Sequence, residues 1–360
     1  MLKEYFKDNL NSFQSKTEIQ KLTFYPMMFQ AARVMRITGI LNETYINRHN
    51  GIDSEKIASK LNLPHYGVKV LLEVSLTIGL VFLKEEGKYC ITKMGYLLLN
   101  DKATIVNLNF SHDICYKAMY HLEESIKKKK PIGLKEIGLD KYSTIYPGLS
   151  ELPEPIKTSW FEFDHYYSDI AFPEALKIVF IDKPLHILDI GGNTGKWSMA
   201  CCRYDKNVRM TIIDLPGQLD SAKENIEANN LQNRIFGKAG DVLSNNLKLP
   251  ADFDTIWMSQ FLDCFSEEQI VKILTNICNE MSVNTNVFIL ELFWDRQKDL
   301  AAAYCLHGIS LYFSAVANGN SKMYHSKDFY KLIEQAGLKV VSDTDHVGEF
   351  HTLLKCKKVF

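Results

Sequence analysis

Acidic residues stand at or just after the ends of three apolar runs in the second half of the chain, at Asp189, Asp214 and Asp241. The runs are short, which is typical of buried strands. A carboxylate at such a strand end can accept hydrogen bonds from both hydroxyls of a ribose, as Asp214 would, or from an adenine amino group, as Asp241 would. Together the three positions predict a site for a nucleotide-like ligand.

A glycine-rich segment begins at the first of these acids, Asp189-Ile-Gly-Gly-Asn-Thr-Gly195. A Walker loop does not fit it, because Ile190 takes the first glycine position and Trp197 the hydroxyl position. A dinucleotide fingerprint fails because Asn193 and Lys196 occupy two of its glycine positions. The remaining pattern, Asp-x-Gly-x-x-x-Gly, resembles motif I of class I S-adenosylmethionine-dependent methyltransferases. In that motif small residues let the backbone approach the methionine part of the cofactor.

Strands and helices alternate after position 186, and they would position these acids. Strand patterns cover residues 186–190, 209–214, 234–239, 254–259 and 286–290, and two more close the chain at 338–342 and 351–357. Helical patterns cover 218–229, 266–281, opened by a capping box of Ser266 and Gln269, and 326–336, which Ser326 would cap. This alternation predicts an α/β fold with a doubly wound sheet.

The first third of the chain carries a different pattern. Helices are expected at 24–44, at 54–61 with Ser54 as the N-cap, and at 68–78, before a hairpin over 80–92. This order is typical of a winged helix, so DNA binding is one interpretation. The last helix, however, offers only one lysine and one glutamate, whereas phosphate binding needs several cations. A dimerisation module is favoured, also because the first helix is apolar on several sides.

Two segments join these parts of the chain. Residues 142–155 are rich in Pro, Gly, Ser and Tyr and are expected to form a linker. Residues 159–170 form a predicted helix that is dense in aromatic side chains. It is either a core helix between two domains or a helix that directs Phe161, His165 and Tyr166 toward a flat aromatic ligand, and the sequence leaves both open.

Composition disfavours several other classes of protein. With a formal net charge of −1, the chain has no global attraction to nucleic acids or anionic membranes. Its eight cysteines include no Cys-x-x-Cys pair, which disfavours a zinc site or a disulfide framework. No secretory signal is apparent, and no run is expected to reach the roughly 18 apolar residues that span a membrane. A cytoplasmic protein without a metal is expected.

Four segments carry a resemblance that covers nearly the whole chain: Leu188-Asp-Ile-Gly-Gly-Asn-Thr-Gly195, Ile213-Asp-Leu-Pro216, Gly240-Asp-Val242 and Leu262-Asp-Cys-Phe-Ser-Glu-Glu-Gln-Ile-Val-Lys-Ile-Leu274. The chain is similar to the small-molecule O-methyltransferases typified by plant caffeate and flavonoid enzymes, a group that includes hydroxyindole and bacterial polyketide enzymes. The resemblance implies S-adenosylmethionine as cofactor, a small aromatic acceptor and a homodimer. It also implies a seven-stranded mixed sheet and three parts: a winged-helix-like dimerisation domain (1–105), a helical connector beside the acceptor (106–180) and a catalytic domain (181–360).

The resemblance and the strand-end pattern together assign roles to residues. The cofactor would be held by the glycine loop and by the loops after the next strands, through Asp189, Gly191, Gly192, Gly195, Asp214, Leu215, Gly240, Asp241, Val242 and Ser259. The acceptor would contact the connector and two later segments, through Phe161, Tyr166, His307 and Met323.

The main departure from the family lies at its catalytic position. The family has Leu-His-Asp-Trp there, and its histidine removes the acceptor proton, whereas this chain has Asp263-Cys-Phe265. Glu291 stands at the family's acid that supports the histidine, Met323 at a second supporting acid, and Ser259 at a lysine.

Several chemistries are compatible with this change. An ordinary aspartate has a pKa of about 3.9 and is a weak base toward a phenol of pKa about 10. If Asp263 and Glu291 face each other, repulsion raises one pKa and favours a carboxylate base. His165 or His307 would be an alternative base, and proximity alone would suffice for a more acidic acceptor such as an aromatic acid. O-methylation is favoured; C- or N-methylation and a non-catalytic, cofactor-binding regulator are the alternatives.

Overall fold

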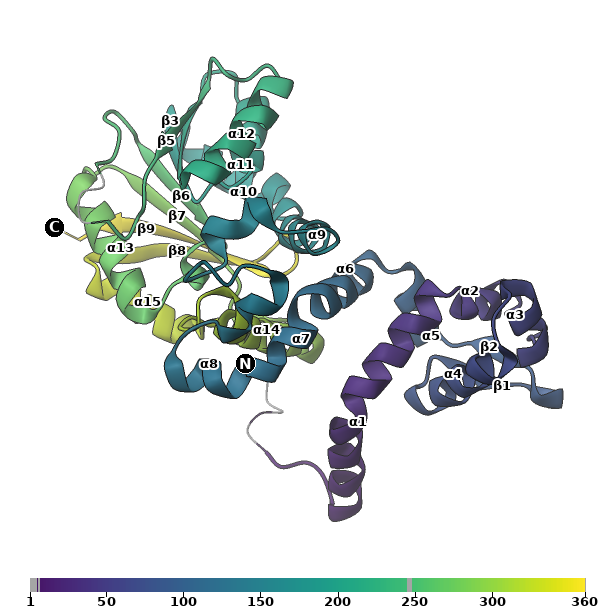
Figure 1. The fold of residues 1–360 in the computed structure, drawn as a ribbon. Coiled ribbons are helices and arrows are strands. Elements are labelled where there is room, and N and C mark those ends of the chain that lie inside the picture. The colour runs from purple at the N-terminus through teal and green to yellow at the C-terminus, as the bar shows by residue number, and fades with distance from the viewer. Residues whose placement is uncertain (1–4, 6, 245–247, 360) are drawn as a thin grey trace. The chain divides into compact units, whose positions relative to one another are not determined.

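The computed structural model describes residue 5, residues 7–244 and residues 248–359. It divides into two compact units, a smaller one that ends at Asn109 and a larger one that begins at Phe110 (Figure 1). Each unit has its own hydrophobic core. The finer division into three parts, with boundaries at residues 105 and 180, stays a prediction.

The smaller unit consists of helices and one short hairpin. Its elements are α1 (Ser12–Ile37), α2 (Ile40–Ile46), α3 (Ser54–Leu61), α4 (His65–Ile78), β1 (Val81–Leu83), β2 (Tyr89–Ile91), α5 (Lys93–Asn100) and the start of α6 (Lys102–Phe110). The strands pair antiparallel, which confirms the predicted hairpin. The helix expected over 24–44 is two helices, because Gly39 adopts a left-handed backbone with φ of 83° between them. The N-cap of α3 is Asp53 rather than Ser54, since the Asp53 carboxylate accepts the Lys56 N–H at 2.9 Å.

The larger unit is built on a seven-stranded sheet with the order β5-β4-β3-β6-β7-β9-β8. The strands are β3 (His186–Ile190), β4 (Arg209–Asp214), β5 (Ile235–Ala239), β6 (Thr255–Ser259), β7 (Asn286–Glu291), β8 (Leu338–Val347) and β9 (His351–Lys358). Neighbours are parallel except β7–β9 and β8–β9, which are antiparallel. This confirms the predicted doubly wound, mixed α/β sheet.

Helices cover both faces of this sheet. They are α10 (Phe172–Val179), α11 (Lys196–Tyr204), α12 (Pro216–Ala228), α13 (Glu267–Glu280) and α15 (Ser326–Gln335). The helices α9 (Ile156–Asp169) and α14 (Leu300–Tyr312) pack instead with the shorter helical segments in a separate cluster. Leu188 and Ile190 of β3 pack in the cluster of α13 and α15, whereas Ile187 packs in the cluster of α10, α11 and α12. This alternation follows from the two-residue period of a strand. The predicted capping box opens α13, but the N-cap of α15 is His325 rather than Ser326.

Shorter helical segments complete the larger unit. Before α9 they are a π-helix (Ser111–Cys115), α7 (Tyr116–Ala118), a 3-10 helix (Met119–His121), α8 (Leu122–Lys128) and 3-10 helices at Ile132–Ile137 and Tyr146–Glu151. After α10 they are 3-10 helices at Phe180–Asp182, Leu262–Cys264 and Trp294–Arg296, and a π-helix at Phe313–Ala317 that continues α14.

Residues 142–155 do not form the linker that their composition suggests. Ile145, Leu149 and Leu152 are buried in a core cluster of the larger unit. The apolar residues recur every three or four positions and therefore face one side. The spacing of these apolar residues indicates a packed segment, whereas the Pro and Gly content alone is typical of a linker.

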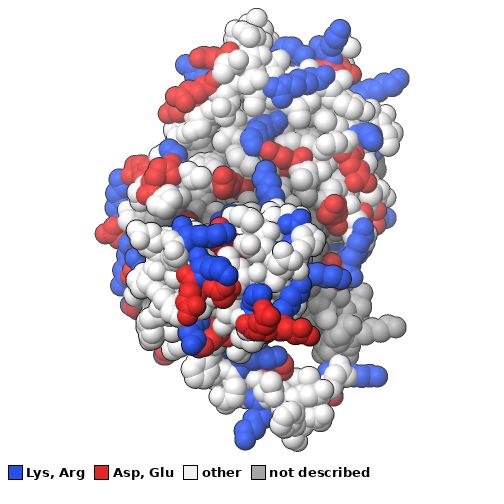
Figure 2. Space-filling model, turned by 90° about the vertical axis from the view of Figure 1, so that its right-hand side faces the viewer, with Lys and Arg blue, Asp and Glu red and all other residues white. Residues whose placement is uncertain are grey.

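The expectation that no run reaches membrane-spanning length is wrong for one segment. Among the described residues, Leu300–Ala317 is the one helical stretch that is long and apolar enough to cross a membrane by length and composition. Core helices of other proteins pass the same test, so this finding alone assigns no location. On the face shown in Figure 2, Lys and Arg side chains are interspersed with Asp and Glu, as on a solvated surface.

The glycine loop between β3 and α11 is set by backbone conformation and packing. Gly191 has φ of 74°, and a Cβ there would lie 2.2 Å from Cδ2 of Phe261. The residue is small because a protein side chain, Phe261, approaches it, in addition to any ligand. Gly195, with φ of 77°, is the N-cap of α11.

Two substitutions, Gly191→Ala and Gly138→Ala, separate the effect of the left-handed backbone from the effect of the Phe261 contact. Gly138 has φ of 79° but no atom within 4 Å of a built Cβ. Gly138→Ala therefore carries backbone strain alone, about 1–3 kcal/mol. Gly191→Ala adds the displacement of Phe261, and we expect a further loss of about 1–3 kcal/mol in the free energy of unfolding, measured with urea. Equal losses in the two variants would contradict the close packing of Phe261.

Candidate active site

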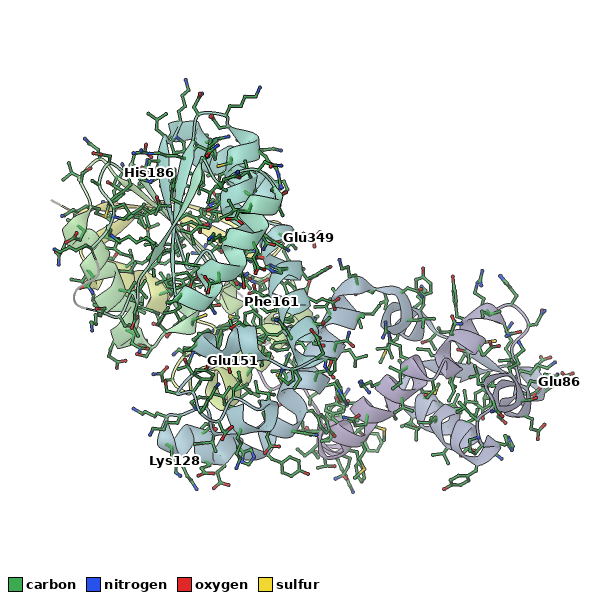
Figure 3. All side chains as sticks on the ribbon, turned by 45° about the horizontal axis from the view of Figure 1, so that its top comes forward. Glu86, Lys128, Glu151, Phe161, His186 and Glu349 are labelled. Atoms are coloured by element: carbon green, nitrogen blue, oxygen red, sulfur yellow. The ribbon has the colours of Figure 1, made fainter. Side chains whose placement is uncertain are left out.

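A cavity of about 490 Å³ opens at the carboxyl ends of β3, β4 and β6. Since β4 and β6 lie on opposite sides of β3, the chain leaves this point in two directions, and open α/β sheets bind ligands at such places. The volume is typical of small-molecule sites. In Figure 3, Phe161 of α9 lies toward this end of the larger unit, and His186, the first residue of β3, toward the opposite end.

Nine of the ten residues predicted to hold the cofactor line this cavity: Asp189, Gly191, Gly192, Asp214, Leu215, Gly240, Asp241, Val242 and Ser259. Gly195 is not among the lining residues; a Cβ on it would lie 3.3 Å from Ile212. The fold therefore gathers strand-end residues that are widely separated in the sequence. Among the described residues, no group of three or more His, Cys, Asp or Glu is placed to hold a metal ion.

The strand-end acids differ in their surroundings. Asp214 accepts the Asn193 N–H at 2.9 Å and the Leu215 N–H at 2.7 Å, and burial raises its pKa to about 6. Each oxygen keeps a second lone pair for a ligand hydroxyl. Asp189 accepts the Ser198 hydroxyl at 2.6 Å, and burial raises its pKa to about 7. Asp241 is exposed, so it belongs to the mouth of the cavity.

Ser259 carries a polar atom that the protein leaves without a partner. Its Oγ is buried and has no hydrogen-bond partner among the described residues, although Ser259 lines the cavity. Buried hydroxyls are usually hydrogen-bonded, so this one points to a ligand or a water.

Asp263 and Glu291 form a buried pair of acids beside the cavity. Neither lines it, but Phe261 and Cys264, which flank Asp263, do. Glu291 Oε1 accepts the N–H groups of Phe261 at 3.1 Å and Leu262 at 2.9 Å, while its buried Oε2 has no partner among the described residues. Burial and then the charge of Asp263 raise the pKa of Glu291 well above its usual range. Burial, with a smaller effect of Asp164, raises the pKa of Asp263 to about 7.

His165 lines the cavity from α9 within a set of polar contacts to the glycine loop. Its Nε2 lies 3.4 Å from Thr194 Oγ1, and burial lowers its pKa to about 4, so the imidazole is neutral near pH 7. The neighbouring Asp164 accepts the side-chain amide of Asn193 at 3.1 Å, and burial raises its pKa to about 6.

The four residues predicted to contact the acceptor are not among those that line the cavity: Phe161, Tyr166, His307 and Met323. Phe161 is half-buried, and its ring centroid lies 6.0 Å from that of His165. Tyr166 packs on Tyr167. Met323 is buried in a core cluster. His307 is exposed and packs on Trp294, so the structure does not bring its imidazole to the cavity.

Further polar residues that the sequence patterns did not mark also line the cavity. The Asn318 amide donates to Tyr146 Oη at 3.1 Å and to the Cys264 carbonyl at 2.9 Å, and both Asn318 and Tyr146 line the cavity. Gln260 also lines the cavity, and its Oε1 accepts a hydrogen bond from His351 Nε2 at 3.1 Å. Tyr146 lies in the segment assigned as a linker, and no local pattern marks Asn318.

Two sequence-family profiles match this chain. A Dimerisation2-like domain matches residues 16–89, and an O-methyltransferase domain matches residues 154–339. The chain is 22% identical over 296 residues to the L-tyrosine C(3)-methyltransferase of Streptomyces lavendulae, covering 80% of this chain and 77% of that one.

Solved structures share the fold. The S-adenosylmethionine-dependent methyltransferase SibL in its apo form aligns with a TM-score of 0.71 at 20% identity, over 95% of this chain and 99% of that chain. The O-methyltransferase NcsB1, in complex with S-adenosylmethionine and 2-hydroxy-5-methyl naphthoic acid, aligns with a TM-score of 0.67 at 18% identity, over 93% and 96%.

The buried Asp263 predicts a pH-dependent effect on stability. Its pKa is about 7 when folded, against an ordinary 3.8. The bound proton thus favours folding, an effect that is complete below about pH 4 and lost as the pH rises through about 7. In urea unfolding, the stability of Asp263→Asn relative to the wild type should therefore rise by about 2–3 kcal/mol from about pH 5 to pH 8, since two pKa units are worth about 2.7 kcal/mol.

The exposed Asp140 provides the control, because Asp140→Asn should show the same difference from wild type at both pH values. A difference for Asp263→Asn that is independent of pH would show that this carboxyl group is not perturbed in the folded protein.

Proposed function

This chain belongs to the O-methyltransferase family, and on that premise we propose that it transfers the methyl group of S-adenosylmethionine to a small aromatic acceptor. The observation that carries the proposal is the cavity at the carboxyl ends of β3, β4 and β6, with acids after three successive strands on its wall. When bound, the cofactor supplies an electrophilic methyl group on a sulfonium.

The cavity wall suits this cofactor along its length. Asp214 would hold the ribose hydroxyls, and Asp241 with Val242 would lie beside the adenine. The Ser259 hydroxyl, which has no hydrogen-bond partner among the described residues, would form a hydrogen bond to the ligand. The glycine loop would approach the amino-acid end. These residue roles are supported by position and by hydrogen-bonding capacity.

Asp263 is our candidate for the base. A carboxyl group of pKa about 7 is a far better proton acceptor near neutral pH than an ordinary aspartate. Asp263 would take the proton of an acceptor hydroxyl, while that oxygen forms the new bond to the methyl carbon and the carbon–sulfur bond breaks. Glu291 would position the turn at Leu262–Cys264 through its two backbone hydrogen bonds.

C-methylation is a second candidate reaction. It is favoured by the similarity to a tyrosine C(3)-methyltransferase and by the missing histidine at position 263. The same base would ionise a phenol, and the ring carbon beside the oxygen would form the bond to the methyl carbon as the carbon–sulfur bond breaks. The hydrogen on that ring carbon would then leave as a proton, which restores the aromatic ring. NMR distinguishes the two products, because methoxy and ring methyl groups have different chemical shifts.

Methyl transfer from labelled S-adenosylmethionine tests the proposal. A panel of catechol, tyrosine and 3-hydroxybenzoate should yield a methylated product with the wild type. Asp263→Asn should lower kcat by about 100- to 10,000-fold with little change in S-adenosylhomocysteine affinity, as expected for the loss of a base. The wild-type rate should rise with pH through about 7, as Asp263 loses its proton.

The exposed Asp220 of α12 gives the matched control, and Asp220→Asn should keep the wild-type rate. An active wild type with an equally active Asp263→Asn would reject the carboxylate base. A wild type that binds the cofactor but methylates nothing would favour a non-catalytic regulator.

We also propose that the chain forms a homodimer through its smaller unit. The Dimerisation2-like match over residues 16–89 lies within that unit, and α1 exposes large apolar side chains, among them Phe13, Ile19, Leu22 and Met27. Exposed apolar surface of this kind marks an interface.

All eight cysteines are free, which supports our expectation of a reducing cytoplasm. No nucleic-acid or membrane partner is part of the proposal.

Charges on α1 test the dimer. Ile19 and Leu22 lie one helical turn apart, so they share a face. Ile19→Lys combined with Leu22→Lys should convert a dimer to a monomer in light scattering, whereas Lys16→Glu, an exposed charge change on the same helix, should not. A dimer that survives the double substitution would place the interface elsewhere.

A further inference from the structure

We propose that Asp164 and Lys196 bind the charged amino-acid end of the cofactor, Asp164 taking its ammonium group and Lys196 its carboxylate. This inference rests on the proposed function, because it assigns two residues of this chain to one end of that ligand. Neither residue was identified from the sequence pattern.

The charged residues that line the cavity identify Lys196 as the partner of the ligand carboxylate. An amino-acid end carries one positive and one negative charge, so its site needs a cation and an anion. Among the described residues that line the cavity, Lys196 is the one lysine or arginine. His165 beside it is neutral near pH 7, because burial lowers its pKa to about 4. A ligand carboxylate in this cavity therefore has a single cationic side chain to bind.

Asp164 is the best placed anion. It lines the cavity from α9, and it is close enough to Lys196 that the lysine charge lowers its pKa against the larger effect of burial. Its Oδ2 accepts the Asn193 amide at 3.1 Å, and no described residue donates a hydrogen bond to its Oδ1. An ammonium group at that oxygen would offset the cost of a half-buried negative charge.

Asp189 is the alternative anion, and its surroundings argue against it. The residue is 2% exposed, and its carboxylate already accepts the Ser198 hydroxyl at 2.6 Å. The backbone of Gly192 covers it, since a Cβ there would lie 2.9 Å from Asp189 Oδ2. Asp189 therefore supports the loop from below, whereas Asp164 faces the loop from α9.

Asp169 holds Lys196 when no ligand is bound. Lys196 Nζ lies 2.7 Å from Asp169 Oδ2, in an ion pair whose side chains are 38% and 40% exposed. Such a pair in contact with water is weak, so a ligand carboxylate can share or replace it. Asp169 thus competes with the ligand, and removing its charge should strengthen binding rather than weaken it.

Calorimetry with two ligands tests this assignment. S-adenosylhomocysteine carries both charges of the amino-acid end, and 5′-methylthioadenosine carries neither. Asp164→Asn and Lys196→Met should each weaken S-adenosylhomocysteine binding by about 10-fold or more, as expected for a charged hydrogen bond. Both should change methylthioadenosine binding by less than about twofold, and Asp169→Asn should tighten S-adenosylhomocysteine binding by about two- to fivefold.

Lys223→Met on α12 is the control for Lys196→Met, because Lys223 is 73% exposed and outside the cavity. Circular dichroism checks folding, and if Asp164→Asn does not fold, Lys196→Met and Asp169→Asn still decide. Unchanged S-adenosylhomocysteine affinity in the folded variants, equal losses for both ligands, or weaker binding by Asp169→Asn would overturn the assignment and leave the proposed function intact. A wild type that binds no S-adenosylhomocysteine would instead reject the proposed function itself.

Discussion

Negative charge buried without matching positive charge is the constraint on which this site depends. Five carboxyl groups in or beside the cavity have raised pKa values, with burial as the largest cause: Asp164, Asp189, Asp214, Asp263 and Glu291. Lys196, the one lysine or arginine of the described wall, is already paired with Asp169. Such a site must hold protons or accept a cation. A sulfonium cofactor supplies the cation, and methyl transfer would replace its charge by the proton taken from the acceptor.

Packing keeps these groups in place. Phe261 fits against Gly191 and so joins the loop after β6 to the glycine loop. Glu291, at the end of β7, holds the N–H groups of Phe261 and Leu262 and thereby fixes the turn that carries Asp263. Glu291 thus uses one oxygen to hold the backbone, which is why we propose Asp263 rather than Glu291 as the base.

The sheet and the strand-end acids could be predicted from sequence because both are local signals. Apolar runs that end in an acid or a glycine are complete within about ten residues. The cavity residues Tyr146 and Asn318 could not be predicted, since Asn318 reaches Tyr146 only after the chain returns across the unit. Tyr146 lies in a Pro- and Gly-rich segment, which we expected to be a linker. His307 was a candidate base in the sequence, but α14 places it on the exposed side of the protein. The raised pKa of Asp263 depends on the burial of its side chain, which the residue pattern around it does not predict.

Proton release on ligand binding reports directly on the buried carboxyl groups of the site. Titration calorimetry of S-adenosylmethionine near pH 6.5, in two buffers of different ionisation enthalpy, counts the protons exchanged. We expect a net release of protons, because an entering cation lowers the pKa of the buried carboxyl groups. We expect a smaller release with S-adenosylhomocysteine, which lacks the sulfonium charge. Binding of both ligands without proton release, or with equal release, would show that the cofactor charge does not compensate the buried carboxyl groups.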